Sequence, residues 1–229
     1  MPYYARKHQI EGNLIYHVLN RANARNKIFH DSTDYDCFMT IILKYSKEKE
    51  MSIYHYCIMP NHYHLLLEIK EPELLSSAMA GINKSYSVYY HKRFKTSGYL
   101  WQGRFKSKPI QKDKHMLTCG RYIERNPVVC GIVSDAENYP YSSAKYYVKG
   151  VSDMLVCEDP LYNNFGNDIE ERRASYKKFL LDFDKESEES YNNFDIPAGD
   201  ALFISKLQKQ EGRYFPRRQG RIRNKIFVP

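Results

Sequence analysis

One short segment, Pro60–Leu66 (PNHYHLL), constrains the fold of this chain more than any other part of its sequence. A turn of the Pro-Asn type is followed by the alternation expected of a β-strand. Side chains two residues apart on a strand point to the same side, so His62 and His64 share one face. The opposite face takes the apolar residues Tyr63, Leu65 and Leu67. We therefore expect the apolar residues in a core and the imidazole pair projecting from the other surface.

Two neutral imidazoles placed side by side can hold one divalent metal ion. The alternative is a half-exposed strand whose polar face carries two histidines without a ligand. The pair alone does not decide between these interpretations. The remaining motifs of the chain favour the first.

The periodicity of the other segments predicts an α+β domain with an antiparallel sheet and helices packed on it. Strands are predicted over Asn13–Arg21, Met51–Met59, His62–Ile69 and, after a turn, within Gly98–Ile110. Helices are predicted from a Thr33 cap, over about Glu73–Phe94, and from an Asp113 cap to about Arg125. Pro127 is expected to stop the last helix, because a proline pushes the preceding residue away from helical dihedral angles.

The composition changes after residue 150, which divides the chain into three predicted regions. Residues 1–150 form the domain, and residues 151–211 form a helical extension with an acidic linker, DKESEES. Residues 212–229 form a basic tail without acidic residues. Such a tail suits contact with nucleic acid, and its candidate DNA-binding residues are Arg217, Arg218, Arg221 and Arg223.

The charge of the chain also points to an anionic partner. The formal net charge is +8 and the pI is about 9.1, and 21 tyrosines supply rings that can stack on unpaired bases. Arg104, Lys106 and Lys108 alternate along the last predicted strand, which gives it one cationic face. We interpret this face as a phosphate contact rather than as solvated charge. Arg21 and Lys84 are further candidates for DNA contact.

The cysteines and the hydropathy exclude two protein classes. Five cysteines, an odd number without a C-x-x-C pair, argue against a disulfide framework or a cysteine zinc site. No long apolar run occurs, and the first residues lack a signal-peptide core. We expect an intracellular, cytoplasmic protein that does not enter a membrane.

Three more residues need an interpretation from the sequence alone. His17 lies in the first predicted strand, and we interpret it as a histidine with a structural partner rather than as a third metal ligand. Tyr122 and Asn126 lie four residues apart and so share one face of the third helix. Taken in isolation, Tyr122 reads as a surface aromatic and Asn126 as a C-terminal cap.

The ordered motifs YHVLNR, MPNHYHLLL, LWQGRFKS, RYIERNPV and YPYSS give these residues a different interpretation. Over about Asn13–Lys149 the chain resembles the REP-associated tyrosine transposases, a branch of the HUH single-strand DNA endonucleases. The resemblance implies a ferredoxin-like core, Mg²⁺ or Mn²⁺, and single-stranded or hairpin DNA from palindromic repeats as the partner. It also implies that Tyr122 is the nucleophile and that His62, His64 and Asn126 are the metal ligands.

The function expected from this resemblance is a metal-dependent single-strand DNA endonuclease and strand transferase with a 5′-phosphotyrosine intermediate. Such chemistry needs no nucleotide cofactor, because the covalent link conserves the energy of the broken phosphodiester. Two alternatives stay open at this stage. The fold could be a non-catalytic module that binds structured nucleic acid, or His62 and His64 could hold zinc for attack by water.

Overall fold

The computed structural model describes residues 14–183 and 190–209. The predicted DNA-binding residues of the basic tail, Arg217, Arg218, Arg221 and Arg223, lie outside the described residues, as does most of the acidic linker. All five cysteines are described and free. Within the described ranges, no helix combines the length and the apolar character needed to cross a membrane.

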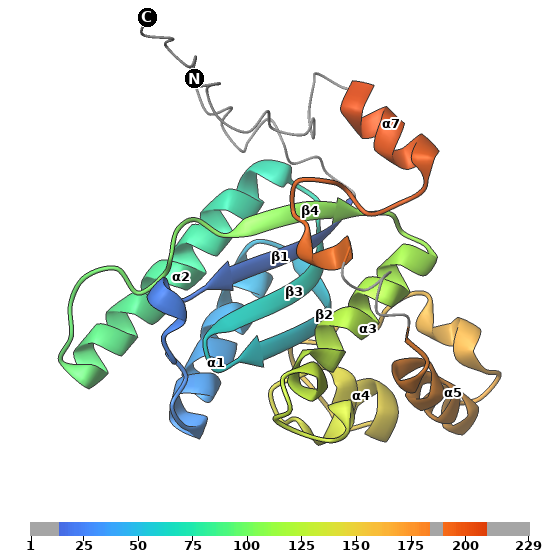
Figure 1. The fold of residues 1–229 in the computed structure, drawn as a ribbon, viewed down its shortest axis with the longest axis horizontal. Helices are drawn as coiled ribbons and strands as arrows, with labels where there is room; N and C mark the ends of the chain where they lie inside the picture. The colour runs from blue at the N-terminus through green and yellow to red at the C-terminus, as the bar shows by residue number, and fades with distance from the viewer. Residues whose placement is uncertain (1–13, 184–189, 210–229) are drawn as a thin grey trace, which may run out of the picture.

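A four-stranded antiparallel sheet forms the centre of the structure (Figure 1). Its strands are β1 (Leu14–Arg21), β2 (Met51–Met59), β3 (His62–Ile69) and β4 (Lys106–Ile110). They lie in the order β2-β3-β1-β4, and the chain passes through them as strand, helix, strand, strand, helix, strand. This is the ferredoxin-like arrangement, so the predicted α+β fold is confirmed.

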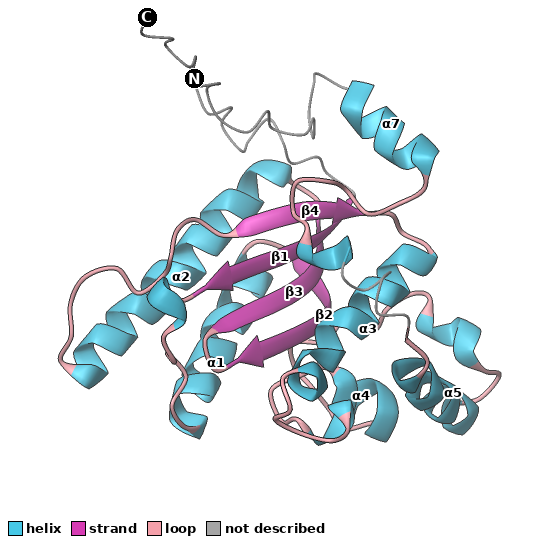
Figure 2. Ribbon diagram, in the orientation of Figure 1, coloured by secondary structure: helices cyan, strands magenta, loops and turns pink. Residues whose placement is uncertain are grey.

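Helices cover both faces of the sheet (Figure 2). Helices α1 (Ser32–Glu48) and α2 (Pro72–Phe94) pack on one face, and α3 (Lys114–Val129) packs on the other. The later helices are α4 (Ala144–Lys149), α5 (Ile169–Leu181) and α7 (Ala201–Lys209). Short 3-10 turns occur at Asn23–Arg25, Ala136–Asn138, Tyr162–Phe165 and Ser190–Asn192.

The alternation along β3 explains why the sheet has two different faces. Tyr63, Leu65 and Leu67 are buried against α1 and α2, as the sequence predicted. Leu66, which shares a face with the histidine pair, packs instead with apolar residues of α3. The sheet therefore carries its histidines on the same side as the helix that contains Tyr122 and Asn126.

The predicted starts of two elements are wrong. Helix α1 is capped by Asp31, whose carboxylate accepts a hydrogen bond from the Thr33 amide at 3.1 Å, and not by Thr33 itself. Strand β4 begins only at Lys106, because the residues before it make isolated contacts with the end of β1. Trp101, for example, forms a single bridge with Ala22.

The C-terminal extension packs into the domain instead of standing apart. Leu155 is buried in the core under α1 and α2, and the Cys157 amide donates to the Ile53 carbonyl of β2 at 2.7 Å. Ala198 exchanges hydrogen bonds with Pro109 and Gln111 at the outer edge of β4. The division at residue 150 stays a prediction, but these contacts cross it at several places.

A buried ionic cluster joins the sheet to α3 and to the extension. His55 of β2 is fully buried, with its Nδ1 2.9 Å from Glu124 Oε1 and its Nε2 3.0 Å from Asp159 Oδ2. Burial acts to lower the pKa of His55, but the two carboxylates outweigh it and raise the pKa to about 9. His55 is therefore a cation at neutral pH.

This cluster predicts a fall in stability as the pH rises from 7 to 8. An unfolded histidine has lost its proton by pH 7, whereas folded His55 keeps its proton up to a pH of about 9. At His55 the folded state thus binds more protons, and this residue should lower the free energy of unfolding by on the order of 1 kcal/mol over this single pH unit. Lys108, whose pKa burial lowers to about 8, acts in the opposite sense but more weakly, because it is still mostly protonated in this range. Urea unfolding at each pH measures it. A flat or rising profile in the wild type would contradict the prediction. The exposed-histidine variant His30→Gln should keep the wild-type slope.

Candidate active site

The two histidines lie side by side at the start of β3, directly after the Pro60–Asn61 turn. Their ring centroids are 5.0 Å apart, and the rings meet nearly at right angles. His62 is only 8 % exposed and His64 2 %, so the expectation that they project from the surface is wrong. Helix α3 and the segment from Ser190 to Ala198 lie on this face of the sheet, where Tyr122 contacts His64 and Phe194 contacts His17.

The hydrogen bonds of Asn61 define the protonation of His62. The side-chain amide of Asn61 donates to the Arg25 carbonyl at 3.0 Å, so its oxygen is the atom that faces His62 Nδ1 at 2.6 Å. His62 Nδ1 is therefore the protonated nitrogen, and Nε2 keeps its lone pair. Burial, followed by the charge of Arg21, lowers the pKa of His62 to about 4, so the ring is neutral at pH 7.

Asn126 owes its orientation to the proline that follows it. The sequence predicted that α3 would stop near Arg125, but the helix continues to Val129 with Pro127 inside it. Because Pro127 has no amide proton, it cannot bond the Ile123 carbonyl. The side-chain amide of Asn126 donates to that carbonyl at 3.3 Å and to the Tyr122 carbonyl at 2.8 Å. Its nitrogen is thus committed to the helix, and its oxygen is left for His62, with which it interacts.

His64 is held by a second histidine. Its Nδ1 lies 2.8 Å from Nε2 of His17 on β1, and the two rings stack. This contact identifies the structural partner predicted for His17. If His64 Nδ1 carries the proton of this hydrogen bond, His64 Nε2 has no proton and stays free for a ligand. His17 then carries its own proton on Nδ1. That buried nitrogen has no partner among the described residues. Burial is the main cause that lowers the pKa of both rings well below the usual value.

Tyr122 lies beside the rings of His17 and His64. Its ring centroid is 5.8 Å from that of His64 and 5.8 Å from that of His17, with both contacts edge-on. Its hydroxyl donates a hydrogen bond to the side-chain oxygen of Asn192. The structure therefore brings together the tyrosine, the asparagine and the histidine pair, which the sequence places up to 64 positions apart.

The segment Ser190–Ala198, which covers the site, was not anticipated. Lys108 is 1 % exposed and donates to the carbonyls of Ser190 at 2.9 Å and of Asn193 at 3.0 Å. The proposed phosphate contact of Lys108 is therefore wrong, because this ammonium is buried and engaged by the chain itself. Its burial lowers the pKa of Lys108 to about 8. Phe194 of the same segment packs on His17, with ring centroids 4.8 Å apart.

Comparison with known proteins covers the part of the chain that forms this site. The sequence model of the family "Transposase IS200 like" matches residues 11–126, just over half of the chain. The chain belongs to this family. The matched stretch contains the histidine pair, Tyr122 and Asn126.

Two curated relatives and one solved structure are also similar to this chain. A REP-associated tyrosine transposase of Haemophilus influenzae is 32% identical over 104 residues, which is 41% of this chain and 58% of the relative. That of Escherichia coli is 25% identical over 139 residues, 60% of this chain and 80% of the relative. A REP-associated tyrosine transposase bound to a REP hairpin superposes with a TM-score of 0.54 at 22% identity, covering 69% of this chain and 93% of that one. At this identity the superposition shows the shared fold.

The side chains of this site fit a divalent metal ion. His62 interacts with Asn126, whose amide nitrogen is engaged by the helix, so the pair can offer an imidazole lone pair and an amide oxygen to one cation. His64 can add a second imidazole nitrogen. Mg²⁺ prefers all-oxygen surroundings, whereas Mn²⁺ also accepts imidazole. A mixed set of two nitrogens and one oxygen therefore suits Mn²⁺ at least as well as Mg²⁺.

The predicted DNA-binding residues fall into two groups. Arg21 ends β1 opposite His62, and Lys106 begins β4 opposite Leu19, so both lie at the sheet end that holds the site. Arg104 is exposed just before Lys106. Lys84 is exposed on α2, which packs on the other face of the sheet. The structure thus brings Arg21, Arg104 and Lys106 towards the site and leaves Lys84 away from it.

The bond between Asn126 and the helix gives a test that separates metal binding from stability. Pro127→Ala restores the missing amide proton, which competes with Asn126 for the Ile123 carbonyl and leaves the Asn126 side chain held only by its bond to the Tyr122 carbonyl. We expect the free energy of unfolding to stay equal or rise, because the helix regains a bond. The affinity for Mn²⁺, measured by electron paramagnetic resonance, should fall by about tenfold. The exposed neighbour variant Val129→Ala should keep the wild-type affinity, and an unchanged affinity in Pro127→Ala would contradict the role given to the proline.

Proposed function

We propose that this transposase is a metal-dependent single-strand DNA endonuclease and strand transferase that acts on hairpin DNA with Tyr122 as its nucleophile. The observation that carries the proposal is the meeting of the Tyr122 ring with two neutral, buried imidazoles and an oriented asparagine oxygen. The relative whose fold this chain shares was solved with a REP hairpin, which supports a hairpin of repeat DNA as the substrate.

The proposed reaction exchanges one phosphodiester for another. The Tyr122 oxygen attacks phosphorus, an oxygen–phosphorus bond forms, and the bond to the 3′ oxygen breaks. The phenol loses a proton and the departing 3′ oxygen gains one, which leaves a 5′-phosphotyrosine and a 3′ hydroxyl. Attack by the same or another 3′ hydroxyl reverses the step and releases Tyr122, so strands can be rejoined without an outside energy source.

Each residue of the site has a part in this scheme. His62, His64 and Asn126 would hold a divalent ion, which when bound neutralises charge that grows on the phosphate oxygens. His17 would orient His64 and keep its Nε2 available, as partners of metal-bound histidines commonly do. Asn192 accepts a hydrogen bond from the Tyr122 hydroxyl, but an amide oxygen cannot act as the base that removes its proton. This hydrogen bond therefore has to break before the hydroxyl can approach a phosphate.

Tyr122→Phe tests the nucleophile directly. The variant should form no covalent adduct with a labelled hairpin oligonucleotide in Mn²⁺ on a denaturing gel, because it lacks the attacking oxygen, while its DNA affinity should stay near that of the wild type. Tyr191→Phe is the matched control, since its ring stacks on Tyr122 with centroids 5.8 Å apart and its hydroxyl bonds the His115 carbonyl. Adduct formation by Tyr122→Phe would overturn the assignment. Tight DNA binding by a wild type that never forms an adduct would favour the non-catalytic binding module.

Lys106→Ala and Lys84→Ala test where the DNA lies. Lys106 shares the site end of the sheet, so its loss should weaken hairpin binding and lower the slope of log affinity against log salt by about one. Lys84→Ala should change neither quantity, because α2 packs on the far face. Equal effects of the two substitutions, measured by fluorescence anisotropy, would place the DNA elsewhere.

A further inference from the structure

Glu124 lies on α3 between Tyr122 and Asn126, yet it takes no part in the site described above. Successive helical residues turn by about 100°, so Glu124 faces away from Tyr122 while Asn126 returns to nearly the same side. The Glu124 side chain is completely buried, and its carboxylate meets three partners. They are His55 Nδ1 at 2.9 Å, the Ser143 hydroxyl at 2.6 Å and the Tyr176 hydroxyl at 2.8 Å.

The partners of Glu124 come from three parts of the chain. His55 belongs to β2, the neighbour of the strand that carries the histidine pair. Its other ring nitrogen is bonded to Asp159, which also accepts the Leu161 amide at 2.7 Å. Asp159 and Tyr176 follow residue 126, where the match to the family ends. One buried carboxylate thus joins the nucleophile helix to the sheet and to the C-terminal extension.

The distance between α3 and the sheet is also fixed at this point. A Cβ atom on Gly120 would lie 2.7 Å from the His55 ring, so any larger residue there would push the helix and the strand apart. Gly120 is one helical turn before Glu124. The glycine therefore allows the close approach, and the carboxylate determines the rotation of the helix at that distance.

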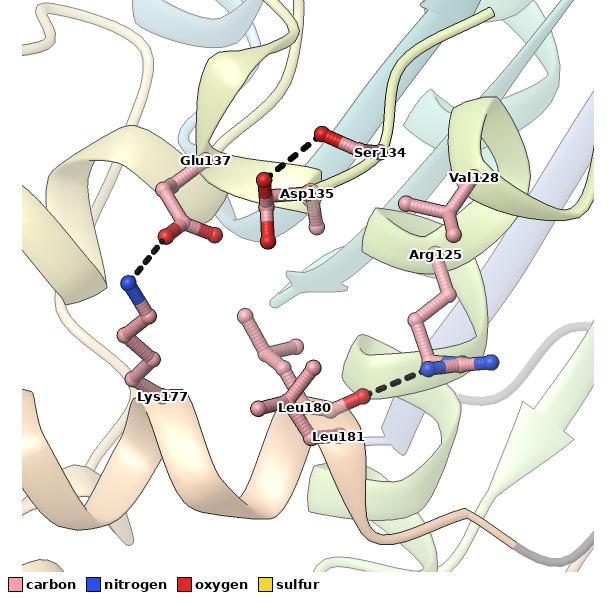
Figure 3. Close-up of a pocket in the computed structure, with 9 residues that line it drawn as sticks. Arg125, Val128, Ser134, Asp135, Glu137, Lys177, Leu180 and Leu181 are labelled. Carbon is pink, nitrogen blue, oxygen red and sulfur yellow. Dashed lines mark hydrogen bonds and ion pairs between the residues drawn. The ribbon is translucent and has the colours of Figure 1, made fainter. Parts of the chain in front are cut away.

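A second set of bonds ties α3 to α5. Arg125 donates to the Leu180 carbonyl at 2.7 Å (Figure 3), and Arg121 donates to the carbonyls of Phe179 and Asp182. These carbonyls belong to the C-terminal end of α5, where a helix has acceptors without partners in its own backbone. The arginines satisfy them, and α5 is thereby held along α3.

We propose that Glu124 is a positioning residue for the strand-transfer reaction, and that Tyr176 and Asp159 make the C-terminal extension part of the catalytic unit. A buried carboxylate adds little net stability compared with an apolar side chain of similar size, because its desolvation offsets its bonds. Its hydrogen bonds nevertheless require a single geometry, because each partner must lie in a particular direction from the carboxylate. That demand sets the rotation of α3 and hence the direction of Tyr122 and Asn126. The inference rests on the proposed function.

Two hydroxyl deletions in the same aromatic cluster test it. Tyr176→Phe removes a donor to Glu124, whereas Tyr162→Phe removes a hydroxyl that bonds only the Tyr147 carbonyl, at 2.7 Å, among the contacts described. With saturating hairpin DNA and Mn²⁺, the single-turnover rate constant of adduct formation should fall by about tenfold in Tyr176→Phe and stay at the wild-type value in Tyr162→Phe. DNA affinity should be unchanged in both. A wild-type rate constant in Tyr176→Phe, or an equal fall in both variants, would overturn the proposal.

A double-mutant cycle separates positioning from general loss of stability. If the Tyr176 hydroxyl acts through Glu124, Tyr176→Phe should lower the rate constant no further in a Glu124→Ala background, which lacks any group to bond that hydroxyl. Independent, multiplicative losses in the double variant would overturn the proposal. Should Glu124→Ala fail to fold by circular dichroism, the comparison of Tyr176→Phe with Tyr162→Phe decides alone. An absence of any adduct in the wild type would instead refute the proposed function, so the two failures are distinguishable.

Discussion

The approach of α3 to the histidine face of the sheet is the constraint on which the remaining structure depends. An ionic hydrogen bond from His55 to Glu124 holds the two elements together where Gly120 permits close contact. Apolar packing alone would tolerate a small rotation of the helix, because hydrophobic contact has no direction. Directional bonds to a buried carboxylate do not tolerate it. This contact helps to set the relative placement of the Tyr122 ring and the histidine pair.

A defect in the same helix orients Asn126, the third of the proposed ligands. Pro127 deprives the Ile123 carbonyl of its usual donor, and Asn126 compensates for the loss with its own side chain. An asparagine elsewhere on the helix surface would be free to rotate, whereas this one has its nitrogen engaged and its oxygen turned to His62. The Asn-Pro pair thus uses an unsatisfied backbone group to orient a side chain, at a position where the helix continues instead of ending.

The sequence predicted well what depends on local alternation, and poorly what depends on distant contacts. The strands Met51–Met59 and His62–Ile69 and the shared face of the histidines follow from a period of two along the chain. The end of α3 was misjudged because the Asn126 side chain supplies the donor that the proline lacks. The covering segment could not be foreseen, since Lys108 meets the Ser190 carbonyl across 82 positions. Glu124 was missed for the same reason, as its partner His55 lies 69 residues earlier.

The backbone bridges formed by the second half of the chain also affect whether the edge strands of the sheet are available to other molecules. Ala198 bonds the outer side of β4 beside Pro109, and the outer side of β2 is met by Ser142 and Val156. Unpaired edge strands invite pairing with strands of another chain, which leads to assembly or aggregation. At these points both borders of the sheet already carry partners from within the molecule. An incoming strand could extend the sheet there only by first displacing one of them.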